Sequence, residues 1–352
     1  MPQLQGVGHG QAAAQLRRGL TGMLQWVVVF FCVAVVGTGL ALRYAVWRNL
    51  FDHPGERRSH ERSTARGGGA AIVAALLIAT FVVAFRDPGE WMLLGAFGIG
   101  LALVAAVGLI DDHKPLSPWL RLAAHMAAAL LMAVALLHVT GDWRVAAVAF
   151  VAITALTNVW NFMDGINGLA ASQAIVVAGL LASGWIGSGT WTWMAAALVA
   201  ACAGFLPYNF PKARIFLGDV GSGSIGYAIA TMVVVLGAGH EKTSWLLLLP
   251  LSAFLVDAGL TLLRRVVRRE AWWAPHTQHA YQIWARKVGH TRVTLAYAVW
   301  TLAGALLLLG IQGMPVGFTL ACAVAWYISA GLAWWLLQCM ESEKKNPHSI
   351  NG

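Results

Sequence analysis

Long, uninterrupted apolar runs dominate the chain and restrict its fold more than any other feature. A helix that crosses a bilayer needs about 20 mostly apolar residues, because hydrocarbon offers no partner for an unpaired backbone N–H or C=O group. We therefore predict an all-α, polytopic membrane protein with about 11 transmembrane helices. The predicted spans cover residues 24–42, 68–86, 91–110, 119–138, 144–158, 168–187, 191–208, 222–238, 244–263, 294–312 and 316–338.

Composition supports lipid as the solvent for most of this chain. Of the 352 residues, 59% are hydrophobic and only 11% are charged, whereas soluble domains carry about 25% charged residues. The net charge of +9 indicates loops that face an anionic leaflet or anionic substrates. We expect no nucleic-acid partner, since no basic stripe is interleaved with aromatics. The first apolar run is long enough to span, which argues against a cleavable signal peptide.

The distribution of basic residues predicts the orientation of the chain. With eleven spans, 19 of the 24 Lys and Arg residues fall in one set of connecting segments. Positively charged loops favour the cytoplasm. This rule predicts a cytoplasmic C-terminus, with a short polar tail at 341–352, and an N-terminus outside.

The unusual polar motifs also belong to this cytoplasmic set of loops. A transporter would place ionisable groups near the bilayer midplane, whereas here they gather at one interface. That arrangement predicts an active site at the membrane surface, with one water-soluble and one lipid substrate. We expect a single domain, 1–352, whose catalytic loops are 43–67, 111–121, 158–168, 208–222 and 264–292.

Asp111 and Asp112 follow directly after an apolar span. Adjacent carboxylates repel each other and cannot both point the same way, so they need a cation or a proton nearby. At headgroup depth a carboxylate could orient or deprotonate a lipid phosphate. Two solvated helix-capping acids are the alternative.

The segments NFMDGINGLA and FLGDVGSGS carry two further aspartates. Asn161 and Asp164 share a helical spacing, and Gly165 lets backbone approach a ligand closely; a simple Asx turn is the alternative. Asp219 stands before a glycine- and serine-rich helix start that favours anions. Its carboxylate could hold Mg²⁺ bridging a diphosphate, because Mg²⁺ usually takes one or two carboxylates plus phosphate oxygens.

Three further groups have weaker signals. His276 and His279 in PHTQHAYQ favour phosphate or sugar contacts over zinc, which would need more ligands; ordinary loop histidines are the alternative. Arg66, before a triglycine, indicates a phosphate approach or a plain hinge. Asp257, the one acid well inside a span, is expected to pair with a loop arginine or to line the cavity.

In this order and spacing, the motifs RSH…RGGG, GLIDD, NxxNFMDGINGLA, YNFPKARIFLGDVGS and PHTQHAYQ resemble one family. They are similar to the polyprenyl-phosphate N-acetylhexosamine-1-phosphate transferases, the membrane glycosyltransferase family 4. The resemblance covers roughly residues 43–292. The form HxxHAYQ resembles the O-antigen-initiating branch and argues against a MurNAc-pentapeptide donor.

The resemblance implies roles for individual residues. It makes Asp111, Asp112 and Asp164 catalytic and Asp219 the metal ligand. The expected nucleotide-sugar-binding residues are Arg66, Asn161, Gly165, Ile166, Asn167, Asn209, Phe216, His276 and His279. Asn167 departs from the family, which more often has aspartate at this position facing uracil. An amide oxygen can still accept a hydrogen bond from the uracil N3–H.

These features together predict an enzyme of the bacterial cytoplasmic (inner) membrane with its active site facing the cytoplasm. It would transfer an N-acetyl-sugar 1-phosphate from a UDP-sugar to undecaprenyl phosphate, release UMP and initiate O-antigen or similar cell-envelope glycan synthesis. Mg²⁺ is the expected cofactor, with Mn²⁺ as a substitute, and a homodimer stays open. Direct displacement is the expected mechanism, and a covalent aspartyl-phosphate is the alternative. A flippase of lipid-linked sugar and an inactive scaffold are the rival functions.

Overall fold

The chain is almost entirely helical in the computed structural model, which describes residues 6–52, 63–186, 189–238, 240, 244–271, 273–274 and 276–345. The only described strands form one short antiparallel hairpin. In chain order the elements are α1 (Gly6–Trp47), β1 (Phe51–Asp52), β2 (Thr64–Ala65), α2 (Ala70–Arg86), η1 (Pro88–Glu90), α3 (Trp91–His113), α4 (Pro118–Thr140), α5 (Trp143–Phe162), α6 (Leu169–Ala182), α7 (Thr190–Asn209), α8 (Asp219–Ala238), η2 (Ser244–Leu247), α9 (Leu248–Val267), α10 (Ala280–Val288), α11 (His290–Ile311) and α12 (Val316–Lys345).

Nine helices in the described part of the chain are long and apolar enough to cross a membrane. Each of the eleven predicted spans is centred on an apolar helix, but α2 and α6, with 17 and 14 residues, are shorter than a span. The fifth predicted span was too short, because α5 has 20 residues. The all-α, polytopic class is confirmed. The number of crossings and the sides on which the termini lie stay predictions.

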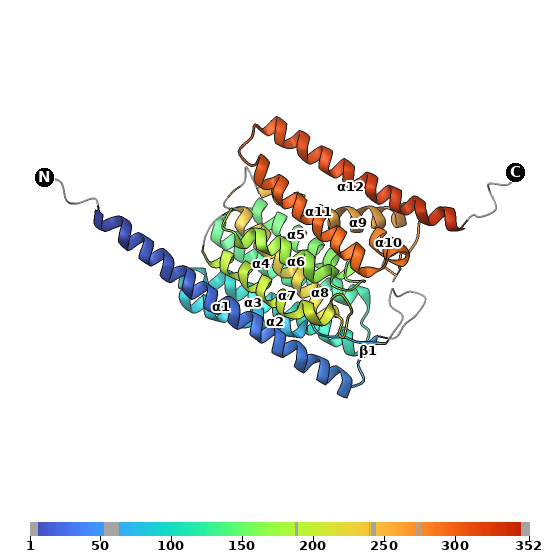
Figure 1. Ribbon diagram of the computed structural model, residues 1–352, viewed down its shortest axis with the longest axis horizontal. Helices are drawn as coiled ribbons and strands as arrows, with labels where there is room; N and C mark the ends of the chain where they lie inside the picture. The colour runs from blue at the N-terminus through green and yellow to red at the C-terminus, as the bar shows by residue number, and fades with distance from the viewer. Residues whose placement is uncertain are drawn as a thin grey trace.

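Helix α8 lies at the centre of the bundle, and 83% of the residues in its most apolar stretch are buried. Small residues let its neighbours approach closely, as is common between membrane helices. A Cβ added to Gly226 would lie 2.7 Å from the Leu156 carbonyl oxygen, and one added to Gly69 would lie 2.1 Å from the Gly221 Cα. By contrast, only 17% and 11% of the residues in the most apolar stretches of α1 and α12 are buried. Figure 1 shows these two helices on opposite flanks of the bundle.

The short hairpin ties the start of α2 to the start of α8. Strand β2 and the residues that follow it form backbone hydrogen bonds with the segment before α8. The Phe216 N–H donates to the Ala65 carbonyl at 2.7 Å, and the Gly68 N–H donates to the Phe216 carbonyl at 2.9 Å. Arg66 is thereby placed beside the first residue of α8. Of the predicted motifs here, RSH at residues 58–60 lies outside the described residues.

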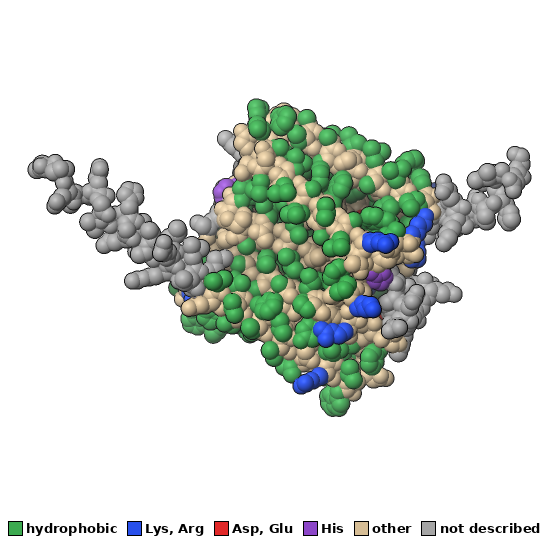
Figure 2. Space-filling view, in the orientation of Figure 1, with side chains coloured by type: hydrophobic (Ala, Val, Ile, Leu, Met, Phe, Trp, Pro, Cys, Tyr) green, Lys and Arg blue, Asp and Glu red, His purple; other side chains and the backbone are tan. Residues whose placement is uncertain are grey.

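The surface is mainly apolar, as expected for a chain in lipid. Figure 2 shows hydrophobic side chains over most of one face, with most of the visible lysines and arginines gathered toward one end. Figure 1 places the hairpin and α10 at this same end. The polar clusters described next belong to this end.

Candidate active site

Asp112 joins the end of α3 to the beginning of α8. Its Oδ1 accepts a hydrogen bond from the Asp219 N–H at 2.9 Å, and its Oδ2 accepts one from the Val220 N–H at 3.2 Å. The carboxylate thus caps α8 from a different helix, where a negative charge also suits the helix dipole. Gly218 makes room for it: its φ is +74°, and a Cβ there would lie 2.4 Å from Asp112 Oδ2.

Arg66 completes the environment of Asp112. Its Nε and Nη2 both donate to Asp112 Oδ1, at 3.0 and 2.5 Å, and the Asp112 side chain is only 1% exposed. Burial works against the charge of the guanidinium, but the Asp112 carboxylate more than offsets it and raises the pKa of Arg66. Both Asp112 oxygens are therefore engaged within the protein, which leaves this carboxylate a role in holding the site together.

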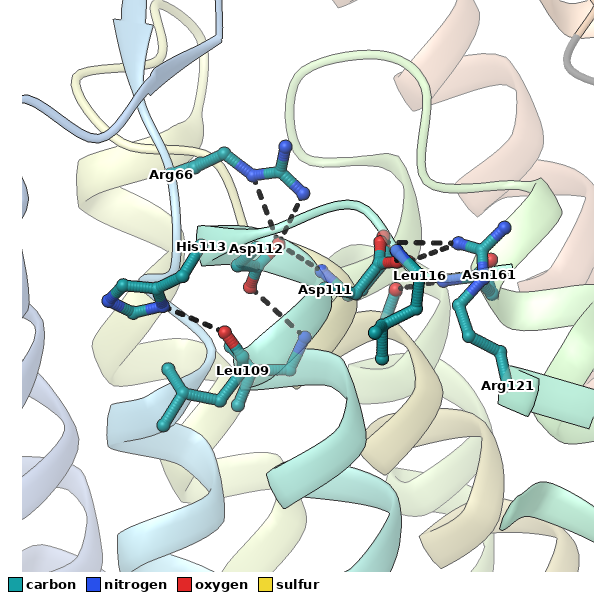
Figure 3. Close-up of polar contacts among 11 residues, drawn as sticks. Arg66, Leu109, Asp111, Asp112, His113, Leu116, Arg121 and Asn161 are labelled. Atoms are coloured by element: carbon teal, nitrogen blue, oxygen red, sulfur yellow. Dashed lines mark hydrogen bonds and ion pairs between the residues drawn. The ribbon is translucent and has the colours of Figure 1, made fainter. Parts of the chain in front are cut away.

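Asp111 points away from Asp112, toward α4 (Figure 3). Its Oδ1 accepts from the Leu116 N–H at 2.6 Å. Its Oδ2 lies 3.4 Å from Arg121 Nη1, and the same nitrogen donates to Asp219 Oδ2 at 2.5 Å. One positive charge from α4 therefore lies between two carboxylates that are 108 residues apart in the chain.

The carboxylates Asp111 and Asp219 fit a divalent cation that substrate phosphates help to bind. In the described part of the chain no three His, Cys, Asp or Glu side chains are grouped to hold a metal unaided. Mg²⁺, however, commonly takes one or two carboxylates and completes its shell with phosphate and water oxygens. The Arg121 Nη1 shows that both Oδ2 atoms can approach one positive centre. Asp112 fits less well, because its oxygens are already engaged.

Asp164 lies in the connection between α5 and α6, which we call the 163–168 loop. Its half-buried carboxylate accepts no hydrogen bond from any residue that the structure describes. Burial, followed by the negative charges of Asp219 and Asp112, raises the pKa of Asp164 well above its ordinary value. Asn161, at the end of α5, donates to the Ser222 hydroxyl on α8 at 2.9 Å. The loop is thus anchored beside the carboxylates, with one acid left unpaired.

The expected nucleotide side of the site joins the 163–168 loop to the end of α7. Asn209 Oδ1 accepts from the Gly168 N–H at 2.6 Å, and its Nδ2 donates to the Ile215 carbonyl at 2.9 Å. Asn167 Nδ2 donates to the Pro211 carbonyl at 3.1 Å, which an aspartate could not do. Ile166 is buried, and Phe216 is half-buried beside this junction. Contacts of these side chains with a nucleotide stay a prediction.

His276 and His279 line a cavity of about 460 Å³ beside the carboxylates. The polar part of its wall includes Arg121, Asn158 and Asn161. Burial, together with the positive charges of His279 and Arg265, lowers the pKa of His276 to about 4, so the ring is neutral near pH 7. The apolar part of the wall includes Trp119, Leu122, Ala258, Leu262 and Trp273. One cavity therefore brings the histidine segment next to the end of α5 and to Arg121, which pairs with Asp111 and Asp219.

The structure brings most of the predicted residues together and adds others. Arg66 pairs with Asp112, and Arg121 pairs with both Asp111 and Asp219. The hydrogen bond from the Asp219 N–H to Asp112 joins the two groups. Arg121 and His125 lie four residues apart on one face of α4, a spacing that predicts a shared role in pairing or in lining the cavity, and both line it. Ser222 was missed, since a serine inside a glycine-rich helix start has no distinguishing sequence signal.

Comparison with known proteins places these residues in a recognised domain. Residues 93–237 match the model of "Glycosyl transferase family 4", a range that contains Asp111, Asp112, Asp164 and Asp219. It does not reach Arg66 or the histidine segment.

Named bacterial relatives extend beyond that domain. A protein of Bacillus subtilis called a probable undecaprenyl-phosphate N-acetylglucosaminyl 1-phosphate transferase is 26% identical over 72% of this chain and 76% of its own length. An undecaprenyl-phosphate alpha-N-acetylglucosaminyl 1-phosphate transferase of Thermotoga maritima is 28% identical over 80% and 86%. A phospho-N-acetylmuramoyl-pentapeptide-transferase of Moorella thermoacetica is 34% identical over 51% and 64%. The comparisons confirm the predicted glycosyltransferase family 4 domain over residues 93–237. These matches do not single out its O-antigen branch.

Proposed function

From the glycosyl transferase family 4 domain that this chain carries, we propose that it transfers an N-acetyl-sugar 1-phosphate from a UDP-sugar to undecaprenyl phosphate and releases UMP. The observation that carries the proposal is the convergence of Asp111, Asp219 and Arg121 beside a cavity lined by both polar and apolar side chains. Two of the relatives are named as transferases of undecaprenyl phosphate, which supports the same acceptor for this chain.

The cavity suits an acceptor with a charged head and a long apolar tail. Arg121 and the asparagines of α5 stand at its polar part and can contact a phosphate. Leu122 on α4 and Leu262 on α9 form part of its apolar wall, on helices long enough to cross a membrane. A polyprenyl phosphate could therefore enter sideways from the bilayer and keep its chain in hydrocarbon.

The reaction we propose is a direct displacement. An oxygen of the acceptor phosphate attacks the sugar-linked phosphorus of the donor, the bond from that phosphorus to the bridging oxygen breaks, and UMP leaves with the bond's electrons. Asp111 and Asp219 would hold Mg²⁺, or Mn²⁺ in its place, which neutralises the diphosphate charge when bound. Asp112 and Arg66 keep α3 and α8 in register. The acceptor phosphate is already mostly dianionic near neutral pH, so Asp111 needs only to orient it.

The orientation of the chain and its histidine segment support a location for the site and a class of glycan product. We place the site at the cytoplasmic face of the bacterial inner membrane, because 19 of the 24 Lys and Arg residues belong to the loops on that side. The HxxHAYQ form favours initiation of an O-antigen or similar cell-envelope glycan. A flippase would need polar residues through the depth of the membrane, and the predicted spans contain few.

The decisive test uses the purified full chain, undecaprenyl phosphate and a panel of UDP-N-acetyl-sugars, with UMP release as the readout. Asp219→Asn and Asp111→Asn should each abolish turnover while thermal unfolding stays close to that of the wild type. Asp142→Asn is the matched control, because Asp142 caps the opposite end of α5. Wild-type rates in either site variant would refute the role of that residue. Labelled phospho-enzyme formed without acceptor would replace direct displacement by a covalent route.

A further inference from the structure

Tyr281 is a fully buried side chain with no assigned part in the proposed displacement. It lies in the first turn of α10, and its hydroxyl donates to the Phe162 carbonyl at the end of α5 at 3.0 Å. A Cβ added to Gly165 would lie 2.2 Å from this hydroxyl oxygen. Tyr281 therefore contacts both the residue before the 163–168 loop and a glycine within it.

The Asp257 carboxylate fixes the backbone of Tyr281 through hydrogen bonds. This carboxylate, only 2% exposed, accepts from the Ala280 N–H at 2.8 Å, the Tyr281 N–H at 3.0 Å and the Tyr297 hydroxyl at 2.8 Å. The expectation that Asp257 pairs with a loop arginine is wrong for the described residues, since its acceptor sites are taken by the start of α10 and by hydroxyls. A buried carboxylate is costly unless it is fully hydrogen-bonded. Its many donors make this one a fixed anchor for α10.

The same short segment carries the two histidines of the cavity. His279 is the residue that precedes α10, and its Nδ1 lies 3.5 Å from Asp257 Oδ1. Its ring stacks on Tyr281 at 5.7 Å between centroids and lies 4.9 Å from the ring of His276. The segment thus places histidines at the cavity and a tyrosine against the 163–168 loop.

We propose that Tyr281, held by Asp257, is a positioning residue that keeps the 163–168 loop in register with the cavity histidines. This inference rests on the proposed transferase function, because it concerns the alignment of the two substrates. The hydroxyl contacts only protein, so its effect on the reaction is indirect. Burial and the negative charges of Asp257 and Asp164 raise the pKa of Tyr281 well above its ordinary value, so it stays a donor over the range of any assay.

The test compares Tyr281→Phe with a matched variant, Tyr227→Phe. Tyr227 is equally buried, and its hydroxyl donates to the Ala96 carbonyl, also in another helix, at 3.4 Å. Misplacement by about 1 Å can cost about 10²-fold in rate, so a loosened loop should lower kcat about tenfold. We expect KM for the UDP-sugar to change less, because the binding groups remain. Tyr227→Phe should keep the wild-type kcat.

Hydrogen exchange supplies a readout that needs no substrate. Exchange in the 163–168 loop should be faster in Tyr281→Phe than in the wild type and unchanged in Tyr227→Phe. If Tyr281→Phe does not fold, Asp257→Asn, which keeps the shape and removes the charge, should show the same two changes. If the wild type is active, the positioning role is overturned when Tyr281→Phe keeps the wild-type kcat or the wild-type hydrogen exchange in the 163–168 loop. It is also overturned when Tyr281→Phe and Tyr227→Phe lose kcat equally. A wild type that releases UMP from no UDP-sugar refutes the proposed function instead, and the exchange result still decides the structural part.

Discussion

The contact between α3 and α8 at Gly108 sets the distance between the carboxylates of Asp111 and Asp112 and that of Asp219. A Cβ at this position would lie 2.5 Å from the carbonyl carbon and oxygen of Asp219 and 2.6 Å from the Val220 nitrogen. Ordinary contact begins near 3.4 Å, so Gly108→Ala requires the two helices to separate by about 0.9 Å. Both sides of the contact are backbone and cannot rotate away. The substitution should therefore move Asp111 and Asp112 relative to Asp219.

The expected effects follow from that displacement. The hydrogen bond from the Asp219 N–H to Asp112, now 2.9 Å, would lengthen beyond a useful distance, which removes a cap worth about 1 kcal/mol. Overpacking costs about 1–3 kcal/mol, whereas alanine in place of glycine in a helix gains only about 0.5–1 kcal/mol. A shift of about 1 Å between reacting groups lowers turnover about 10²-fold. We expect Gly108→Ala to fold with a lower unfolding temperature and to lose about 99% of its UMP release.

Gly95→Ala is the control, since Gly95 lies in the same helix and a Cβ there meets nothing within 4 Å. It should be as stable as the wild type or slightly more stable, with unchanged turnover. If Gly108→Ala turns over at the wild-type rate, the close approach of α3 and α8 does not set the geometry of the site. If Gly95→Ala loses as much activity, the effect belongs to glycine replacement in general.

Two further predictions concern charge. His276→Asn should reduce the pH dependence of stability: burial lowers the folded pKa of His276 to about 4, while an unfolded histidine has a pKa of about 6.5. The stability from the neutral ring is thus complete above pH ~6.5 and is lost as pH falls toward 4. Thermal unfolding at pH 7 and pH 5 should show a smaller drop in the variant, and an equal drop would contradict the burial of this ring. Arg121→Gln should tighten Mn²⁺ binding about tenfold, an effect of about 1.4 kcal/mol, because the guanidinium competes for Asp111 and Asp219. Electron paramagnetic resonance titration without substrate measures this, and weaker binding would show that Arg121 helps to form the cation site.

The helices and the meeting of the main motifs could be predicted from sequence for physical reasons. A run of 20 apolar residues has few outcomes in lipid other than a helix, so the predicted spans fall on helices even where the ends were misjudged, as in α5. Loops that share one side of the bundle must come near each other, which is why Asp111 and Asp219 could be expected to meet. The same reasoning could not decide whether α2 and α6 cross the bilayer, since apolarity alone does not separate a span from a shorter buried helix.

Particular partners in the site depend on packing that sequence does not reveal. Nothing in the motif GLIDD indicates that Asp112 caps a helix 107 residues later while Asp111 faces α4. Asp257 was noticeable as an acid within a span, but its partners on α10 and α11 depend on which helices are neighbours. Gly165 was expected to let backbone approach a ligand closely, whereas in the structure a Cβ there would collide with the Tyr281 hydroxyl, a partner that the sequence did not indicate.

The enclosure of α8 has a consequence for how enzymes of this design can diversify. In the most apolar stretch of α8, 83% of the residues are buried. This enclosed helix, with Asp219 as its first residue, would give the proposed phosphate chemistry a stiff platform. Under the proposed function, adaptation to a new sugar is therefore easier in the segment around His276, which is not part of α8. Lineages that exchange one sugar for another should differ mainly in that segment and keep the small residues that surround α8.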